Sequence, residues 1–200
     1  MTTVGNSSGR STESGGERIS RAAYELFCRQ GVRDVGVDAI IARAGTAKMT
    51  LYRNFPSKDD LILDFLQRRE RLWTRDWLQH ESRLRGARPQ DQLLAVFDLF
   101  AEWFARPDFE GCAFLTTMME ITDVAHPVRR ASVEHLARIR EYLATVAEET
   151  GVADPELFAR QWHVLMKGSI MAAQEGDDRA AHAARELGVL LLRSHGLDAT

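Results

Sequence analysis

The sequence has few cysteines and no long apolar run. Of its 200 residues only two are cysteines, Cys28 and Cys112, which lie far apart and form no CxxC pair, so no disulfide framework is indicated. No apolar stretch approaches the roughly 20 residues of a transmembrane helix. No basic segment followed by an apolar one opens the chain, as it would in a secretory signal. These absences predict a cytoplasmic protein with free thiols and no membrane partner.

Motifs for catalysis and metal binding are also missing. The chain has no glycine-rich phosphate loop, no GxSxG and no HExxH, and its six histidines neither cluster with cysteine nor form an i, i+4 pair. We therefore expect no enzymatic activity, no cofactor and no metal site. His163, within an apolar segment, is expected to be a hydrogen-bonded core or interface residue. Glu120 and Asp123 are expected to be solvated or bonded to a neighbouring helix rather than to act as an acid/base pair.

The charge of the chain is unevenly distributed. The net charge is −3, but residues 1–60 carry nine Lys/Arg against seven Asp/Glu. Residues 61–200 are therefore more acidic than the chain as a whole. A mildly basic end on an acidic body suits a protein that docks that end onto phosphates.

Apolar residues recur at helical spacing along most of the chain, and no segment alternates as a strand would. We expect an all-α protein of about nine helices, at about 17–30, 38–44, 47–54, 58–85, 90–105, 112–124, 127–150, 155–174 and 180–193. Residues 1–16, rich in Gly, Ser and Thr, are expected to form a flexible arm. Residues 17–60 would form one domain and residues 61–200 a second.

The segment from Val37 to Asp60 carries the functional signal. Two short helices joined at Gly45, behind a longer first helix, are typical of a helix-turn-helix. The second short helix would lie in the major groove of double-stranded DNA. Ser57 would cap the following helix, whose amide end is a phosphate site. The predicted DNA-binding residues are Thr46, Ala47, Lys48 and Thr50 at the base edges, with Asn54, and Tyr52, Arg53 and Lys58 at phosphates.

This segment resembles the recognition helix of the TetR family of transcriptional regulators and its entry into the fourth helix. Residues 46–61 read TAKMTLYRNFPSKDDL, where the family typically has Gly-Val-Ser-Lys-Gly-Thr-Leu-Tyr, a His- or Asn-Phe pair, and Ser-Lys-Glu-Glu-Leu. The match extends back through Ile40, Arg43, Ala44 and Gly45, and covers about 50 residues. Ile41, Thr46 and Met49 depart from the pattern, and the last two fall where bases are contacted, so they would alter operator preference.

The resemblance implies a C-terminal domain that senses a small molecule and forms a homodimer. A weaker likeness, in Gly111-Cys112-Ala113-Phe114, Glu120, Asp123 and His126-Pro127-Val128-Arg129, points to one branch of the family. In that architecture the last two helices usually build a four-helix bundle with the partner. Residues 155–173 and 180–192 suit this independently, because they are too apolar to face water on more than one side.

The resemblance also implies an effector pocket among the middle helices of the C-terminal domain. The predicted lining residues are Trp103, Phe104, Phe114, Met118, Met119, Trp162 and Met166, since aromatic and methionine side chains make adaptable apolar pockets. The alternative is that these side chains simply fill a core. For Cys112 the two interpretations are a redox sensor at a helix start and a small buried hydrophobe.

The sequence thus predicts a homodimeric DNA-binding regulator, a repressor released from its operator by an apolar or amphipathic small molecule. One alternative is a DNA-binding regulator or architectural protein that has no effector. The other is a small helical enzyme with an incidental helix-turn-helix.

Overall fold

The computed structural model describes residues 13–198, and every regular element among them is a helix. They are α1 (Gly15–Asp34), α2 (Val37–Ala44), α3 (Lys48–Asn54), α4 (Lys58–Arg69), η1 (Glu70–Gln79), α5 (His80–Arg85), α6 (Pro89–Phe104), α7 (Ala113–Glu120), α8 (Pro127–Thr150), α9 (Pro155–Gln174) and α10 (Ala180–Ser194). Because α4, η1 and α5 follow one another without a break, the described chain contains nine separate helices. The all-α prediction is confirmed.

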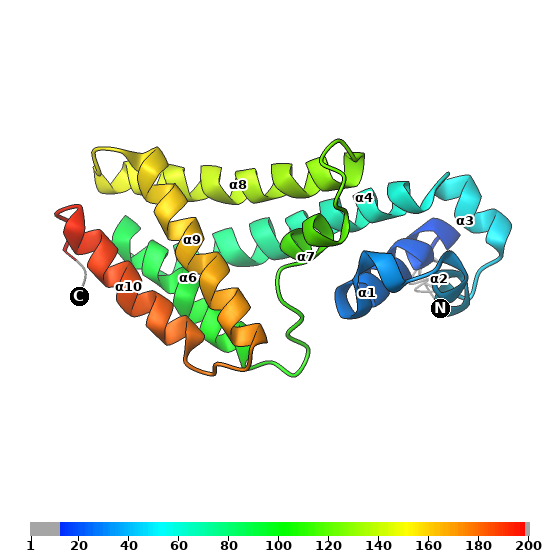
Figure 1. Ribbon diagram of the computed structural model, residues 1–200, viewed down its shortest axis with the longest axis horizontal. Helices are drawn as coiled ribbons and strands as arrows, with labels where there is room; N and C mark the ends of the chain where they lie inside the picture. The colour runs from blue at the N-terminus through cyan, green and yellow to red at the C-terminus, as the bar shows by residue number, and fades with distance from the viewer. Residues whose placement is uncertain (1–12, 199–200) are drawn as a thin grey trace, which may run out of the picture.

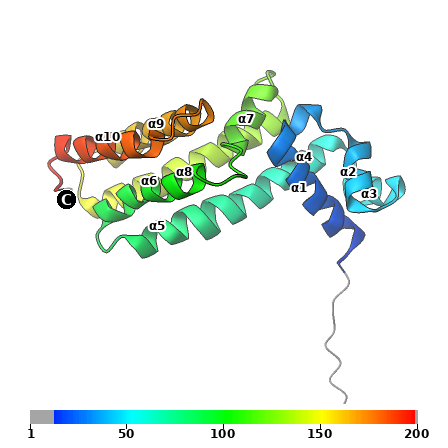
Figure 2. The ribbon, with the colours of Figure 1, turned by 90° about the horizontal axis from the view of Figure 1, so that it is seen from below.

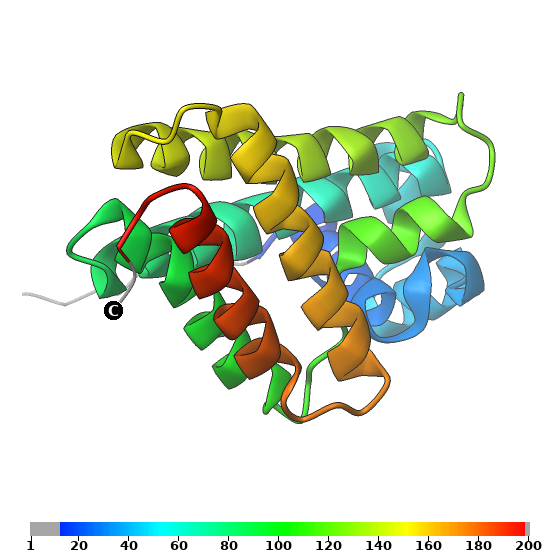
Figure 3. The ribbon, with the colours of Figure 1, turned by 60° about the vertical axis from the view of Figure 1, so that its left-hand side comes forward.

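The helices build an elongated molecule with the N-terminal helices at one end (Figure 1). α1, α2 and α3 group around the start of α4, and the continuous helix α4–η1–α5 then runs along the length of the molecule (Figure 2). α6 returns beside it and α8 lies along it. α9 and α10 lie side by side (Figure 3), and Figure 1 shows them toward the opposite end of the molecule from α3.

Local sequence explains most helix boundaries. Ser57 accepts from the Asp60 amide while the Asp60 carboxylate accepts from the Ser57 amide, a capping box that starts α4. Asp154 caps α9 in front of Pro155. Gly45 takes the left-handed conformation after α2, with φ 59°, which a residue with a Cβ rarely adopts.

Three boundaries differ from the prediction. α1 begins at Gly15 rather than at residue 17, because Ser14 and Glu17 form a capping box, so residues 13–16 are not part of a flexible arm. Residues 1–12 of the predicted arm lie outside the described residues. Gly31 interrupts α1 with φ 78°, as expected, but one further turn follows it. The predicted helix at 112–124 ends at Glu120.

A single hydrophobic core runs through both ends of the molecule. Ile19, Ile40 and Leu51 pack together in the N-terminal part, where each is fully buried. Phe65 and Leu66 of α4 continue this core toward the C-terminal helices. The N-terminal helices are therefore packed against the rest of the protein and not joined to it by a loose linker.

The last helix is held by a close approach at Gly188. A Cβ at this position of α10 would lie 2.9 Å from Trp162 Cη2 of α9 and 3.1 Å from Phe97 Cε2 of α6. These distances are shorter than ordinary van der Waals contact, so the glycine permits three helices to meet.

We expect Gly188→Val to lower the free energy of unfolding by about 1–3 kcal/mol, because the added Cβ and its two methyl groups overpack this junction. Gly188→Ala should cost less, since its better helix propensity, worth roughly 1 kcal/mol, offsets part of the strain. Urea denaturation of the three proteins measures both effects. A valine variant as stable as the wild type would mean that α10 is free to move away from Trp162.

Candidate DNA-binding surface and ligand cavity

The second and third helices form a tight bihelical unit at the end of the molecule. α2 and α3 are joined through Gly45, and Leu51 anchors α3 with a fully buried side chain. The remaining surface of α3 faces away from the core. Lys48, Met49 and Arg53 are exposed there, and Met49 has 83% of its surface accessible. A short helix with one buried anchor and an exposed polar face is what a major groove accommodates.

The predicted DNA-binding residues divide into two groups by exposure. The exposed ones are Ala47, Lys48, Tyr52, Arg53 and Asn54, and the half-buried ones are Thr46, Thr50 and Lys58. The sequence alone did not indicate this division, because both groups share the same short segment.

Intramolecular contacts occupy some of these polar groups. Lys48 Nζ lies 3.8 Å from the Asp38 carboxylate, an exposed pair of little energetic weight. Lys58 Nζ donates to the Arg33 carbonyl oxygen at 3.2 Å, and Asn54 Nδ2 donates to the Thr50 carbonyl oxygen at 2.7 Å. The exposed Lys48 ammonium is thus more readily available to a ligand than the half-buried Lys58 ammonium.

The start of α1 lies against α3, a contact that the sequence pattern did not indicate. A Cβ on Gly15 would lie 2.7 Å from Thr50 Cγ2, and one on Gly16 would lie 2.6 Å from Asn54 Oδ1. The two glycines, which read as flexible chain in the sequence, instead allow α1 to approach the recognition helix. The position of α1 is therefore coupled to that of α3.

Two polar contacts join the end of α1 and the start of α4 to helices α7 and α8. The Glu120 carboxylate at the end of α7 accepts from the Arg33 amide at 2.8 Å, and a Cβ on Gly31 would collide with that carboxylate. His126, at the start of α8, lies 3.4 Å from the Asp59 carboxylate at the start of α4. The expectation that Glu120 is bonded to a neighbouring helix is confirmed.

The predicted effector residues do not surround one cavity. Phe114 stacks on His135, with ring centroids 5.0 Å apart, and Trp162 packs between Phe97 and Phe158. Met166 is buried beside them, whereas Met119 is largely exposed. Met118 is half-buried, and Phe104 lies at a separate surface hollow near Gly176. These six residues therefore do not line one common cavity among the described residues, because helical periodicity cannot specify which partner fills the space beside a buried side chain.

Trp103, the seventh predicted residue, lines a cavity of about 410 Å³ at the junction of the two domains. α1 contributes Tyr24, Glu25, Cys28 and Arg29, while α4 and η1 contribute Arg69, Leu72, Trp73 and Trp77. Trp103 of α6 and the following Arg106, Asp108 and Glu110 complete the lining. This volume lies within the roughly 300–1,000 Å³ that small-molecule sites occupy.

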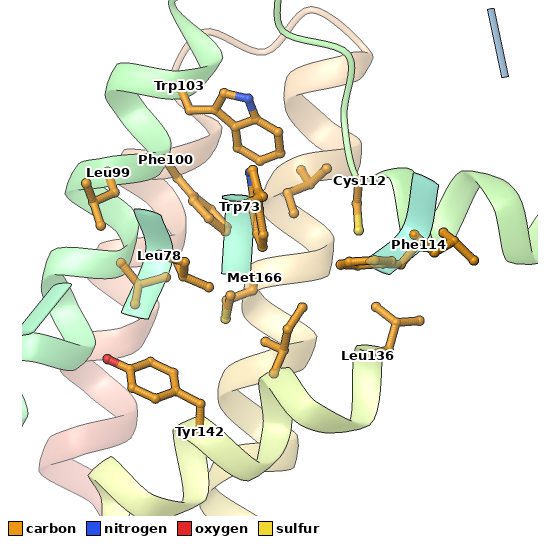
Figure 4. Packing of buried hydrophobic residues seen from close by; sticks show 14 of the residues in the cluster. Trp73, Leu78, Leu99, Phe100, Trp103, Cys112, Phe114, Leu136, Tyr142 and Met166 are labelled. Carbon is orange, nitrogen blue, oxygen red and sulfur yellow. The ribbon is translucent and has the colours of Figure 1, made fainter. Parts of the chain in front are cut away.

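The aromatic wall of the cavity comes from one irregular stretch of helix. η1 is a π-helical segment, a form that occurs frequently at functional sites. It places Trp73 and Trp77 side by side, with ring centroids 5.3 Å apart, and each ring also contacts Trp103. Figure 4 shows Trp103 above Trp73 in the packed interior. The indole N–H of Trp73 is buried with no acceptor among the described residues.

The thiols and His163 lie in apolar surroundings. Burial raises the pKa of Cys28 to about 11 and also raises the pKa of Cys112. Cys112 is buried and packed in the core, which favours the small-hydrophobe interpretation over the redox one. Burial lowers the pKa of His163 to about 3, and its Nδ1 has no hydrogen-bond partner among the described residues. The expectation that His163 is a hydrogen-bonded residue is therefore wrong for this nitrogen.

α9 and α10 carry an exposed apolar face at the far end of the molecule. Val164, Leu187 and Leu190 are 66%, 51% and 58% exposed. Leu165, Leu187, Leu190 and Leu191 line a groove of about 350 Å³ between the two helices. Large apolar side chains gathered on one face mark an interaction surface.

No helix within residues 13–198 is long and apolar enough to cross a membrane. In the same range no group of three or more His, Cys, Asp or Glu side chains is arranged to hold a metal ion.

Known families and structures match both parts of the chain. Residues 19–65 match the model of bacterial regulatory proteins of the TetR family, and residues 89–187 match the tetracyclin repressor-like C-terminal domain. A search of curated proteins found no match.

Solved structures agree with the family models over nearly the whole chain. A TetR-family transcriptional regulator from Streptomyces coelicolor is 29% identical, with a TM-score of 0.82 over 90% of this chain and 95% of that one. A putative TetR transcriptional regulator from Streptomyces avermitilis is also 29% identical, with a TM-score of 0.81 over 92% of this chain and 100% of that one. Escherichia coli NemR in its reduced form, 17% identical, shares the fold over 88% of this chain and 97% of its own, with a TM-score of 0.77. Both halves of the chain, in the expected order, therefore show that it belongs to the TetR family of transcriptional regulators and carries an N-terminal DNA-binding helix-turn-helix domain.

Proposed function

We propose that this regulator is a homodimeric repressor whose affinity for its operator falls when a small molecule binds. The observation that carries the proposal is the recognition helix α3, held by the buried Leu51 while Lys48, Met49 and Arg53 face outward. Its natural site of action is the cytoplasm, where bacterial DNA lies.

α3 would read the major groove of operator DNA. Lys48 can donate to guanine, and the exposed Met49 can contact a thymine methyl group. Tyr52 and Arg53, also exposed, are placed to contact phosphates on either side of the groove. Lys58 would release the Arg33 carbonyl to reach a phosphate at the start of α4.

Dimerisation through α9 and α10 would place two such helices on successive half-sites. The exposed apolar face around Val164, Leu187 and Leu190 supports this arrangement, because a two-fold contact covers the same patch on both protomers. Half-sites read by a dimer lie about 34–36 Å apart, so a monomer would lose the second contact.

The effector would occupy the cavity at the domain junction. Its walls come from α1 of the DNA-binding domain and from α4, η1 and α6, so a ligand there touches both domains at once. A ligand that favours one relative position of the domains shifts the population by its differential affinity for the two positions. Since α1 lies against α3, a change in the relative position of the two domains would move the recognition helix.

An alternative is a regulator that has no effector and in which this cavity stays solvent-filled. A thermal-shift screen separates the two functions, because a ligand that binds the folded state raises the melting temperature by mass action. The DNA-binding function itself is tested by footprinting on the DNA that flanks the gene for this protein. Protection of two half-sites with two-fold symmetry is expected, and no protection of that DNA at low salt would contradict local regulation.

We expect Lys48→Ala and Lys58→Ala to weaken operator binding in different ways. Lys48→Ala should cost about 1–3 kcal/mol and relax base preference at one position of each half-site. Lys58→Ala should weaken binding to all sequences alike and lower the salt slope by about one per contact. Binding titrations on a set of single-base operator variants at several salt concentrations measure both. A uniform loss for Lys48→Ala would assign that lysine to a phosphate.

We expect Leu190→Glu to convert the dimer into monomers, because the carboxylate would be buried without a partner at the α9–α10 face. Leu84→Glu is the matched control, since Leu84 is 68% exposed on α5, outside this face. Light scattering on both variants gives the mass in solution. A Leu190→Glu protein that remains fully dimeric would place the interface elsewhere.

We expect Glu120→Ala to lower stability by about 1 kcal/mol, because the Arg33 amide loses its acceptor. Glu120→Gln keeps an acceptor oxygen in the same place and should lose less. Chemical denaturation gives the stability, and operator titration shows whether this contact sets the position of α1. Equal stability of all three proteins would mean that water replaces the carboxylate without cost.

A further inference from the structure

Arg69 is a buried cation that forms no ion pair with a carboxylate of the cavity wall among the described residues. Its side chain belongs to the last turn of α4 and the residue is only 8% exposed. It donates to the Tyr24 hydroxyl at 3.1 Å and contacts Cys28 Sγ at 3.8 Å, and its guanidinium lies 5.9 Å from the Trp73 ring centroid. No ion pair joins Arg69 to a carboxylate within residues 13–198. Burying a charge without a counter-charge is costly.

Two of the three carboxylates that line the cavity are already neutralised by other arginines. Glu25 accepts from Arg43, outside the cavity, at 2.6 Å and 3.0 Å. Asp108 and Arg106 form a two-pronged pair with both distances at 2.8 Å.

The remaining charges of the lining leave an excess of positive charge. Arg69 and Arg29 face a single remaining carboxylate, Glu110. Burial raises the pKa of Glu110 although the nearby Arg69 charge acts to lower it, so the net shift favours the neutral form relative to an exposed glutamate. The cavity therefore favours an anionic guest over a cationic one.

The rest of the wall selects for a flat aromatic body. The three indole rings of Trp73, Trp77 and Trp103 contact one another at centroid distances of 5.2 to 5.8 Å. The phenol ring of Tyr24, on α1, also lines the cavity. Aromatic rings stack on such surfaces in offset or edge-on geometry, and a volume of about 410 Å³ suits a small ligand.

We propose that the effector of this regulator is a small aromatic carboxylate, whose carboxylate pairs with the Arg69 guanidinium while its ring lies against the wall that the three tryptophans form. This inference rests on the proposed function and narrows its effector from an apolar or amphipathic molecule to a planar organic anion. Arginine suits this role because its planar fork binds a carboxylate through two parallel hydrogen bonds.

The same arginine explains how the anion would reach the DNA-binding helices. The Arg69–Tyr24 bond joins the end of α4 to α1, and Tyr24 also packs edge-on against Phe65. A carboxylate that takes up the guanidinium competes with the Tyr24 hydroxyl for it. The ligand thereby breaks the Arg69–Tyr24 bond that holds α1 to α4. Because α1 lies against α3, the recognition helix would move with it.

The test compares acids with neutral and cationic compounds of the same shape. Benzoate, 1-naphthoate and indole-3-acetate are titrated into the full-length protein beside their primary amides and, for naphthalene, 1-naphthylmethylammonium. Calorimetry and tryptophan fluorescence report binding. At least one acid should bind about 10- to 100-fold more tightly than its amide, which is the range for a hydrogen-bonded charge pair, and should quench the indole emission.

Arg69→Met identifies the anchor, because methionine fills much of the same space without a charge. This variant should bind the acid and its amide equally, whereas Arg83→Met, on the same long helix but paired with Glu149, should keep the preference. Circular dichroism confirms that each variant is folded, and Arg69→Lys, which keeps the charge, should retain part of the preference.

Each outcome has a separate meaning. If no acid binds, if the amides or the ammonium compound bind as tightly as the acids, or if Arg69→Met keeps the preference, the anion site is wrong. If an acid binds through Arg69 but leaves the protein–operator complex intact, the anion site stands and the proposed release by an effector is wrong. If the acid binds through Arg69 and dissociates the complex, both stand.

Discussion

The uninterrupted helix from Lys58 to Arg85 is the constraint that organises the rest of the molecule. Its first turn begins beside the recognition helix, and its last turn lies in the C-terminal domain (Figure 2). Phe65 and Leu66 join the two cores from within this helix. Since a packed helix moves as a rigid element, a change at its middle cannot leave both ends in place. The cavity lies at that middle, where Arg69 and η1 follow one another.

The sequence predicted the part of the fold that local chemistry controls. Capping residues and proline placement gave α8 and α9 their observed limits, and Gly45 marked the turn before the recognition helix. The apolar residues Ile19 and Phe27, which lie at helical spacing in α1, are both buried in the core. These features depend on neighbours within one or two turns of helix, which a single sequence records.

The cavity depends on contacts between distant segments, and for this reason it was mostly missed. Trp103, a predicted pocket residue, does line the cavity, but its partners in the wall, Trp73 and Trp77, are not among the predicted lining residues. The π-helical register of η1, which brings them together, leaves no periodic signal in the sequence. Arg69 read as one of many charged residues, although it is buried. The available clue in the sequence was an arginine at helical spacing from Phe65 and Leu66 on one side and from Trp73 on the other.

A protein selected only for stability would have little use for an unpaired buried guanidinium at a domain junction. Replacing a buried charge by an apolar side chain of similar volume is often neutral or stabilising. A role in function therefore explains Arg69 better than a contribution to stability. The bonds to the Tyr24 hydroxyl and to Cys28 Sγ both come from Nη1 of a group that has five N–H donors. The incomplete satisfaction keeps this contact weak enough to be displaced, while the surrounding core of Phe27, Phe65 and Leu66 keeps α1 folded. A weak contact between the two domains is suited to a switch. A ligand then needs only a modest difference in affinity for the two conformations to shift the equilibrium between them.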